Sequence, residues 1–492
     1  MYHVLALLAL LSCVGPDQPA SSAAAKITDL VPADSLVMYA AKPYGWLDAA
    51  SRPAKEGEEP KTGGFSIASI VSILNAAGMI PDEGQVFADI ASAMPLLGRF
   101  EHAVLLVDVS SKVIELRADP QDSAPAKRSL RLKSLQTAIV FRTAGNDHAV
   151  LEQLDRVVGR YTNRDVAELS SLKAGDDSYQ RLRDDRLPGW AVWEWGRLGE
   201  FFVVSFGKGT FEQIALAYRG KTPRLSADSW FQAASAKTHG DRAQAQWFIA
   251  FSRLKDALGE AAEGRVSRVA AELKADDMTH DLWTIGQEGR SLTWYRCYRR
   301  NGLDVMHRYS DPANYSQRHM RIVPDEASRL AIINVPTRWL VDNLPRAWLA
   351  SQSEGNVRKW QRAWKRLEQE TGTDISRGLI EHLGETVVIF DYPRHPLDIP
   401  FALTVAIEID DPAAVRMATD ALLSAWGQYL DERAERNQTV LVRVYVKHDD
   451  DGVWYLQAGI LGPALMVTDH YVVWSWSPQA LRDALKHIER TE

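Results

Sequence analysis

Short apolar runs between turn-forming residues alternate along the chain with amphipathic stretches of helical period, which predicts a mixed α+β fold. Gly, Pro, Asn and Asp separate most of these runs. The predicted strands are 36–39, 103–108, 138–142, 201–206, 247–251, 292–300, 303–309, 330–333, 386–391, 403–409 and 471–476. The predicted helices are 149–154, 211–218, 261–274, 357–367, 415–422 and 478–488.

Several of these patterns occur twice and in the same order, which predicts an internal duplication. Val31-Pro32-Ala33-Asp34 and Val323-Pro324-Asp325-Glu326 each precede a buried strand. Leu97-Gly98 and Leu383-Gly384 each precede an apolar strand that ends in Asp. A strand–turn–helix unit and a final hairpin–helix unit then follow in both halves.

The turns of the repeated units carry helix-capping residues. Asn146 and Asp411 are expected N-caps, with Pro412 at the first helical position, where its missing N–H costs nothing. Thr210 and Ser477 are the hydroxyl caps of the final helices, and Thr210 with Gln213 forms a capping box.

The sequence offset between corresponding motifs is similar for the first two pairs and again for the last two pairs. The offsets are 323−31=292, 383−97=286, 411−146=265 and 477−210=267. The offset falls between the second and the third pair of motifs, so the first copy has extra residues there. Asp119–Arg128 lies in this part of the chain and predicts a solvated loop. Gly57–Gly64 predicts a second charged loop.

We therefore expect two diverged copies of one α+β unit, each a mixed or antiparallel sheet with helices packed on one face. The predicted organisation is a signal peptide and tether (1–25), a first repeat (26–225), a central insert (226–320) and a second repeat (321–492). Asn301-Gly302 predicts a type I′ hairpin in the insert. Its register points Cys297 and Met306 inward, with Arg296 and His307 on the other face.

The N-terminus predicts export. Val4–Leu11 is an uninterrupted apolar run, followed by small residues that end at Ser22-Ala23-Ala24-Ala25. This layout is typical of a secretory signal and too short for a membrane-spanning helix, although Met1-Tyr2-His3 lacks a basic residue.

Two processing sites fit this segment. Leu10-Leu11-Ser12-Cys13 resembles the lipobox of bacterial lipoproteins, which makes Cys13 a candidate lipidation site with Gly15–Ala25 as its flexible tether. Cleavage after Ala25 would release the protein instead. We favour the anchored form slightly. Cys297 is then the sole unmodified cysteine, so no internal disulfide is expected.

Composition narrows the classes of partner. The 492 residues exceed what one core usually supports, and 46% are hydrophobic and 25% charged, as in ordinary globular proteins. The net charge is −7 with acids and bases interspersed, so no nucleic acid partner is expected. Beyond the N-terminus no apolar run reaches the roughly 18 residues of a transmembrane span, so none is expected in the mature chain.

In order and composition the chain resembles a domain-of-unknown-function family of large exported bacterial proteins. The similarity rests on the Val-Pro-Ala-Asp strand, the Leu-Gly strand, the strand–Asp-x–helix unit and the hairpin–helix, from Leu30 to Ile488. These motifs are structural, and the family has no established activity. The resemblance therefore implies architecture and compartment only.

Two loops superficially resemble ligand-binding motifs. Phe206-Gly207-Lys208-Gly209-Thr210 lacks the first Gly of a phosphate loop and has Gly after its Lys, so a helix cap is the favoured interpretation. Asp449-Asp450-Asp451-Gly452 lacks the ligand alternation of a calcium loop, and a charged hairpin turn is favoured, as for Asp184-Asp185 in the first copy.

The ionisable residues form no recognised catalytic set. Asp276-Asp277 with His280-Asp281 is the most metal-like cluster, but a solvated linker before a strand at Leu282 is favoured. The 12 histidines show no paired metal spacing, and there is no G-x-S-x-G elbow. Arg296, Arg299 and Arg300 could activate Cys297, but the hairpin register favours a buried thiol.

The 16 tryptophans are the compositional oddity. Val357, Trp360, Trp364 and Leu367 repeat at helical spacing, which predicts a core-facing stripe with the basic residues outward. Exposed Trp could stack on sugars, but core packing is favoured for the tryptophans that occupy matching places in the two copies. These are Trp190, Trp193, Trp195, Trp454, Trp474 and Trp476.

No catalytic, cofactor-binding or metal-ligating residue is therefore assigned, and no cofactor is expected. We expect an exported, periplasmic or envelope-anchored protein with a non-enzymatic binding or structural role and an envelope macromolecule as partner. Secretion is the alternative to envelope location. The alternatives in function are an exported hydrolase of polysaccharide or peptide with an unrecognised acidic site, and a small-molecule carrier using the cleft between the repeats.

Overall fold

The computed structural model describes most of the chain, and its α+β class agrees with the sequence pattern. The described residues are 26–43, 96–97, 99–116, 127–162, 167–259, 267–272, 275–289, 291–327, 330–334, 337, 343, 346–350, 352, 354–372, 374–391, 403–436, 445–457 and 462–491. Cys13, both predicted processing sites and Gly57–Gly64 lie outside these residues.

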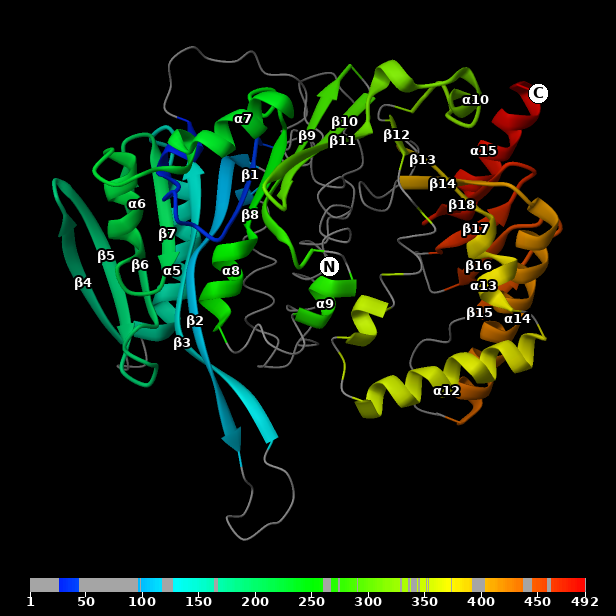
Figure 1. The fold of residues 1–492 in the computed structure, drawn as a ribbon, viewed down its shortest axis with the longest axis horizontal. Coiled ribbons are helices and arrows are strands. Elements are labelled where there is room, and N and C mark those ends of the chain that lie inside the picture. Colours follow the sequence, from blue (N-terminus) through cyan, green and yellow to red (C-terminus); the bar gives the residue numbers. More distant parts are fainter. Residues whose placement is uncertain are drawn as a thin grey trace, which may run out of the picture. The chain divides into compact units, whose positions relative to one another are not determined.

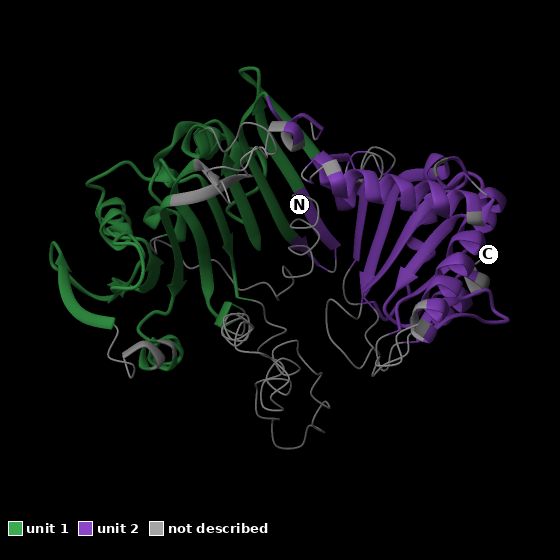
Figure 2. Cartoon of the chain, turned by 90° about the horizontal axis from the view of Figure 1, so that it is seen from below, with its two compact units in different colours: residues 1–266, 277–286, 295–307 green, residues 267–276, 287–294, 308–492 purple. Residues whose placement is uncertain are grey.

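The strands are joined by hydrogen bonds into one large, mostly antiparallel sheet (Figure 1). The chain separates into two compact units, coloured in Figure 2: unit 1 comprises residues 1–266, 277–286 and 295–307, and unit 2 comprises 267–276, 287–294 and 308–492. Strands β9 Met278–Glu288, β10 Ser291–Arg300 and β11 Leu303–Ser310 are divided between them.

Unit 1 holds a sheet in which every described pairing is antiparallel. Its order is β4–β5–β6–β7–β3–β2–β1–β8–β9. Its strands are β1 Val37–Ala41, β2 Glu101–Leu116, β3 Lys127–Arg142, β4 Ala167–Ala174, β5 Asp177–Asp184, β6 Val192–Leu198, β7 Phe201–Phe206 and β8 Ala245–Ala250. Its helices are α5 His148–Thr162, α6 Thr210–Tyr218, α7 Ser229–Lys237 and α8 Phe251–Leu258.

Unit 2 has a sheet of order β15–β16–β17–β18–β14–β13–β12, also antiparallel throughout. The strands are β12 Leu330–Asn334, β13 Leu383–Asp391, β14 Leu403–Ile409, β15 Tyr445–His448, β16 Trp454–Gln457, β17 Ala464–Val467 and β18 Tyr471–Ser475. The helices are α9 Ser267–Glu272, α10 Gln317–Met320, α12 Glu354–Thr371, α13 Ile375–Gly378, α14 Pro412–Arg436 and α15 Pro478–Thr491.

The same connection order appears in both units. The comparison is between β1–β7 of unit 1 and β12–β18 of unit 2. In each set the third strand (β3 or β14) pairs with the seventh (β7 or β18). The sixth, fifth and fourth strands then follow in that order toward the edge of the sheet. A helix (α5 or α14) follows the third strand, and another (α6 or α15) follows the seventh. A common origin of the two units would be argued from this shared connection order.

Helices pack on both faces of each sheet, so the prediction of helices on one face was wrong. In unit 1, α6 and α7 cover the face of Phe201 and Val203, while α5 packs against the face of Phe202. In unit 2, α15 and α14 likewise bury opposite faces. The physical reason is that the central strands are apolar at successive positions, which leaves two faces to cover.

Helix starts were predicted with mixed success. Asp411 accepts the N–H groups of Ala413 and Ala414 at 3.1 and 3.0 Å, and Ser477 accepts that of Ala480 at 3.4 Å, so both caps are confirmed. Asn146 is exposed, and Asp147 directly precedes α5 instead, so the predicted N-cap is one residue early.

Two loops were only partly foreseen. β3 already begins at Lys127, inside the predicted loop Asp119–Arg128, of which residues 119–126 lie outside the described part. β9 begins at Met278, so Asp281 lies in a strand and is 1% exposed. The expected solvated linker is therefore correct for the turn at the exposed Asp276 and wrong for His280-Asp281, because Asp281 is buried with its own charged partner.

The hairpin between β10 and β11 matches its prediction. Asn301 and Gly302 have φ values of 50° and 78°, as the two central positions of a type I′ turn require. Cys297 is fully buried, and Met306 packs against the same core, which confirms the inward face. Burial raises the pKa of the Cys297 thiol, so the activated alternative is not supported.

We predict that Cys297 does not react with a disulfide reagent in native buffer when Cys13 is replaced by Ala. The reactive species is the thiolate, and burial both disfavours and shields it. Labelling followed by absorbance should become stoichiometric only in guanidinium chloride. Rapid stoichiometric labelling of the folded protein would contradict a buried thiol.

Candidate functional site

The turn between β7 and α6 contains the phosphate-loop-like segment. Gly207 has a φ of 110°, and a Cβ at this position would lie 2.2 Å from the carbonyl oxygen of Leu135. Gly209 also has a positive φ of 82° and is the residue before the helix. The glycines therefore allow a close approach of two backbones and a left-handed turn, both of which disfavour a side chain.

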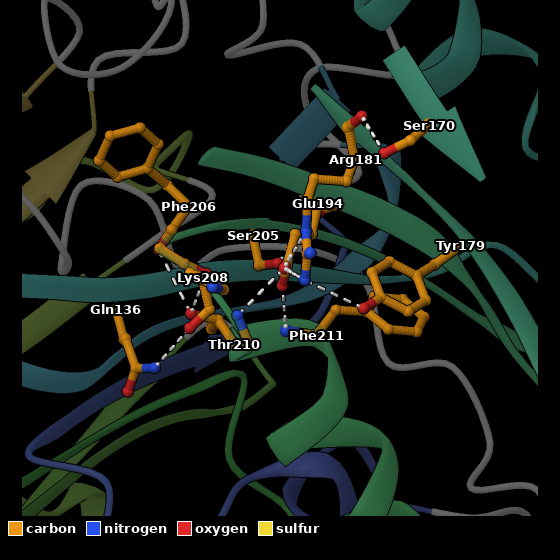
Figure 3. A network of polar contacts seen from close by, with 12 residues as sticks. Gln136, Ser170, Tyr179, Arg181, Glu194, Ser205, Phe206, Lys208, Thr210 and Phe211 are labelled. Carbon is orange, nitrogen blue, oxygen red and sulfur yellow. Dashed lines mark hydrogen bonds and ion pairs between the residues drawn. The ribbon is translucent and has the colours of Figure 1, made fainter. Parts of the chain in front are cut away.

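The carboxylate of Glu194 lies at the start of α6 (Figure 3). Its Oε1 accepts the N–H of Gly209, and its Oε2 accepts the N–H of Phe211, each at 3.0 Å. Glu194 is 0% exposed and comes from the adjacent strand β6. A side chain distant in sequence thus fills the position where a helix N-terminus attracts an anion.

Arg181 on β5 neutralises this buried charge. Its Nε and Nη2 donate to Oε1 of Glu194 at 3.0 and 2.7 Å. Nη2 also donates to the hydroxyl of Tyr179 at 3.2 Å, and Tyr179 stacks on Phe211 with ring centroids 4.6 Å apart. The carboxylate is therefore held by charge-assisted bonds and its surroundings by packing, which suits a fixed structural contact.

This arrangement occupies the amide groups that a phosphate loop would offer to a ligand. The amide groups of Gly209 and Phe211 are already occupied by Glu194, and Lys208 is exposed. Thr210 donates to the carbonyl of Gly207 at 2.7 Å and is the first residue of α6. The predicted Thr210 cap is therefore wrong, because the carboxylate of Glu194 has that role.

The equivalent place in unit 2 has no charged pair. Glu194 lies opposite Ser205 on β7, and Ala464 lies opposite Ser475 on β18. Arg181 pairs with Glu194 across β5 and β6, whereas Tyr455 pairs with Ala464. The start of α15 uses Ser477 instead. The buried ion pair is thus a feature of unit 1 alone at this position.

The most metal-like cluster does not converge. Asp277 accepts from Arg300 Nε at 2.6 Å, which lowers the pKa of the Asp277 carboxyl. Asp281 accepts from Nε and Nη2 of Arg296, each at 2.9 Å. His280 packs on the ring of Trp230, with centroids 4.9 Å apart. Two carboxylates of this cluster, Asp277 and Asp281, are therefore arginine partners.

Arg296 lies between aromatic rings. Its guanidinium carbon is 4.5 Å from the ring centroids of both Trp283 and Tyr298. Tyr298 also stacks on His307, at 5.6 Å between centroids, and burial lowers the pKa of His307. This face of β9–β11 is therefore a stack of cation and aromatic groups centred on Asp281 and Arg296.

The Asp-rich segment 449–451 forms a hairpin turn, as predicted. Asp449 accepts the N–H of Val453 at 2.8 Å and is bound by Arg482 of α15, while Gly452 has a φ of 78°. Asp184 is bound by Arg186, whose hydrogen bonds lower the pKa of that carboxyl to about 2. Across the described ranges, no three His, Cys, Asp or Glu side chains form a group that could hold a metal ion.

The tryptophans are less buried than predicted. Trp195 is 7% exposed, but Trp193 on the same strand is 37% exposed. Trp190, Trp454, Trp474 and Trp476 are half-buried. Core packing is therefore correct for Trp195 and wrong for Trp193, although both side chains point to the same face of β6. Trp195 belongs to the buried cluster with Phe202, whereas Trp193 lies farther along the strand against the ring of Phe206.

A shallow surface hollow of about 620 Å³ lies beside the loop after α6. It is lined by residues 218–224 and Ala227. Its arginines are engaged, since Arg219 binds Asp177 and Arg224 lies 3.7 Å from Asp29. The hollow therefore brings no catalytic set together.

Comparison with known proteins does not identify a family. No protein-family model and no curated protein matches the chain. A solved structure described as crystal form III of TP0453 is similar at 10% identity, covering 58% of this chain and 83% of that one, with a TM-score of 0.27. A likeness of that strength supports no argument about fold or function. In the described part of the chain, no helix has the length and apolarity needed to cross a membrane.

We predict that Glu194→Ala lowers the free energy of unfolding by about 3 kcal/mol, because it leaves Arg181 without its buried partner. Urea denaturation followed by circular dichroism would measure the change. Glu212→Ala is the matched control, since Glu212 is exposed on the same helix and should change stability by less than about 0.5 kcal/mol. Equal effects of the two substitutions would contradict a structural role for Glu194.

Proposed function

We propose that this protein is an exported component of the bacterial cell envelope with a non-enzymatic binding or structural role. The observation that carries the proposal is the hydrogen bonding and ion pairing of three candidate carboxylates. Glu194, Asp281 and Asp449 are each bound by an arginine and by further donors of the protein itself. A general acid or base must exchange protons with a substrate, which such pairing disfavours.

We also propose that the two units are diverged copies. Their shared connection order supports this, and so does their register. One row of paired residues crosses four neighbouring strands in each unit. In unit 1 the row is Met38, Leu105, Ala138 and Ser205, and in unit 2 it is Leu330, Phe390, Thr404 and Ser475. The offsets 330−38=292, 390−105=285, 404−138=266 and 475−205=270 follow those of the sequence motifs. In this alignment β6 corresponds to β17.

The envelope location rests on the N-terminal segment. The apolar run Val4–Leu11 and the lipobox-like Leu10–Cys13 suit export followed by lipidation of Cys13. A folded part tethered by Gly15–Ala25 would then stay close to a membrane. The hydrolase and carrier alternatives stay predictions, because no described feature favours either over a binding role.

We predict that the mature protein from bacterial membranes begins at Cys13 and carries a thioether-linked diacylglycerol. Intact-mass and peptide mass spectrometry would detect it, and Cys13→Ala should move the protein out of the membrane fraction. Cys297→Ala is the control, since that thiol is buried and should not affect fractionation. An unprocessed chain in the cytoplasm would overturn the proposed location.

A further inference from the structure

Three aromatic side chains lie next to one another at the surface of unit 1. Trp193 of β6 and Phe206 of β7 are directly opposite in the strand register, with ring centroids 4.9 Å apart. Trp190, in the loop before β6, has its ring centroid 5.9 Å from that of Phe206. Trp193 is 37% exposed, and the other two side chains are half-buried. We call Trp190, Trp193 and Phe206 the aromatic platform.

The aromatic platform lies on the face of the sheet opposite to Glu194. Successive residues of a strand point to opposite faces, so Trp193 points away from the side of Glu194, and its partner Phe206 points with it. In Figure 3 the ring of Phe206 likewise points away from Glu194. Helix α5 covers another part of this face, and its cluster contains Trp195 but not Trp193. The platform is therefore outside the core that α5 covers.

Backbone hydrogen bonds fix the loop that joins β5 to β6 and carries Trp190. The N–H of Lys208 donates to the carbonyl oxygen of Trp190 at 2.9 Å, and the N–H of Gly207 donates to that of Val192 at 2.8 Å. The other two rings stand on paired strands. Aromatic side chains also have only two torsions each, so little conformational freedom is lost when a ligand binds them. The platform is thus preorganised for a flat ligand.

The small area of the platform favours sugar rings over a protein partner. An aromatic side chain has roughly 150–250 Å² of surface, so three partly buried ones offer less than about 300 Å². A stable protein–protein interface buries about 800 Å² on each partner. A pyranose ring, by contrast, presents an apolar C–H face comparable in size to one aromatic ring. The exposed area therefore fits one or a few sugar units.

The charged groups that border the platform are largely paired. Asp184 is two residues along β5 from Leu182, which pairs with Trp193, so it lies on the face of the platform. Arg186 donates to Asp184 through Nε and Nη2 at 3.0 and 2.6 Å, and its side chain is 56% exposed. Lys208, in the turn after β7, is also exposed. The border therefore offers hydrogen-bond donors with little net charge, which suits the hydroxyl and acetamido oxygens of an uncharged sugar.

We propose that the aromatic platform binds the glycan chain of an envelope polysaccharide built from N-acetylated amino sugars. The apolar face of one sugar stacks on the exposed part of Trp193, and the border donates hydrogen bonds to the sugar oxygens. This inference rests on the proposed function, which places the protein in the cell envelope, and it names the chemical class of the partner.

The test uses the full chain with Cys13→Ala, so that no acyl chain contributes to sedimentation. The parent should co-sediment saturably with purified peptidoglycan sacculi, and chitotetraose, a soluble oligomer of N-acetylglucosamine, should displace it. Trp193→Ala should weaken this binding by about tenfold, because it removes a ring that stacks on an aromatic side chain. Trp190→Ala should weaken it independently, whereas Trp193→Phe keeps an aromatic ring and should retain most of the affinity.

Trp426→Ala is the matched control. Trp426 lies on α14 in unit 2 and is 40% exposed, close to the exposure of Trp193. Its removal should leave binding to sacculi unchanged. Urea denaturation followed by circular dichroism establishes that each variant is folded, so that a loss of binding reports on the platform.

Three results would overturn the inference. The first is the absence of saturable binding of the parent to sacculi, and the second is an equal effect of Trp193→Ala and Trp426→Ala. The third is binding that chitotetraose does not displace, which would point to the peptide part of the sacculus. All three are measured on purified protein, so glycan binding succeeds or fails separately from the lipidation of Cys13 and the location in the cell.

Discussion

The buried carboxylate of Glu194 fixes the start of α6, and the core of unit 1 depends on where that helix lies. Phe211 and Ile214 of α6 are fully buried and belong to the same core cluster as residues of β1, β2, β3 and β7. Glu194 reaches the helix from a neighbouring strand, and Arg181 supplies the opposite charge from the next. Two hydrogen bonds to backbone N–H groups and one ion pair therefore join three elements at a single point.

The second unit shows how the same plan can be built without a buried charge. Ala464 and Tyr455 occupy the places of Glu194 and Arg181, and a local serine caps α15. Replacing a buried ion pair by apolar residues is often neutral or stabilising, provided that both partners change. The difference is thus compatible with one architecture, and it argues that Glu194 stabilises the turn of unit 1.

Much of the fold could be predicted from local patterns. β7, β14, β18 and most of β13 were predicted because their apolar runs are nearly continuous. β4 and β5 were missed, because alternating polar strands such as Asp177–Asp184 lack that signal. The packing of α5 was also missed, although the consecutive apolar residues of β7 indicate that both faces are covered.

The role of Glu194 could not be predicted, because the cap and the helix it closes lie 15 to 17 residues apart in sequence. Local capping rules instead favoured Thr210, which is close in sequence. Helical spacing correctly predicted that the basic residues of α12 point outward. The stripe Val357, Trp360, Trp364 and Leu367 was predicted to face the core, but these side chains are only half-buried.

Glu194 and Arg181 are expected to stabilise the start of α6 together. A double-mutant cycle with Glu194→Gln, Arg181→Met and the double variant, each measured by urea denaturation, tests this claim directly. The account predicts a coupling free energy of at least about 1.5 kcal/mol, with the double variant more stable than additive losses would allow. Additive losses, with a coupling free energy near zero, would contradict it.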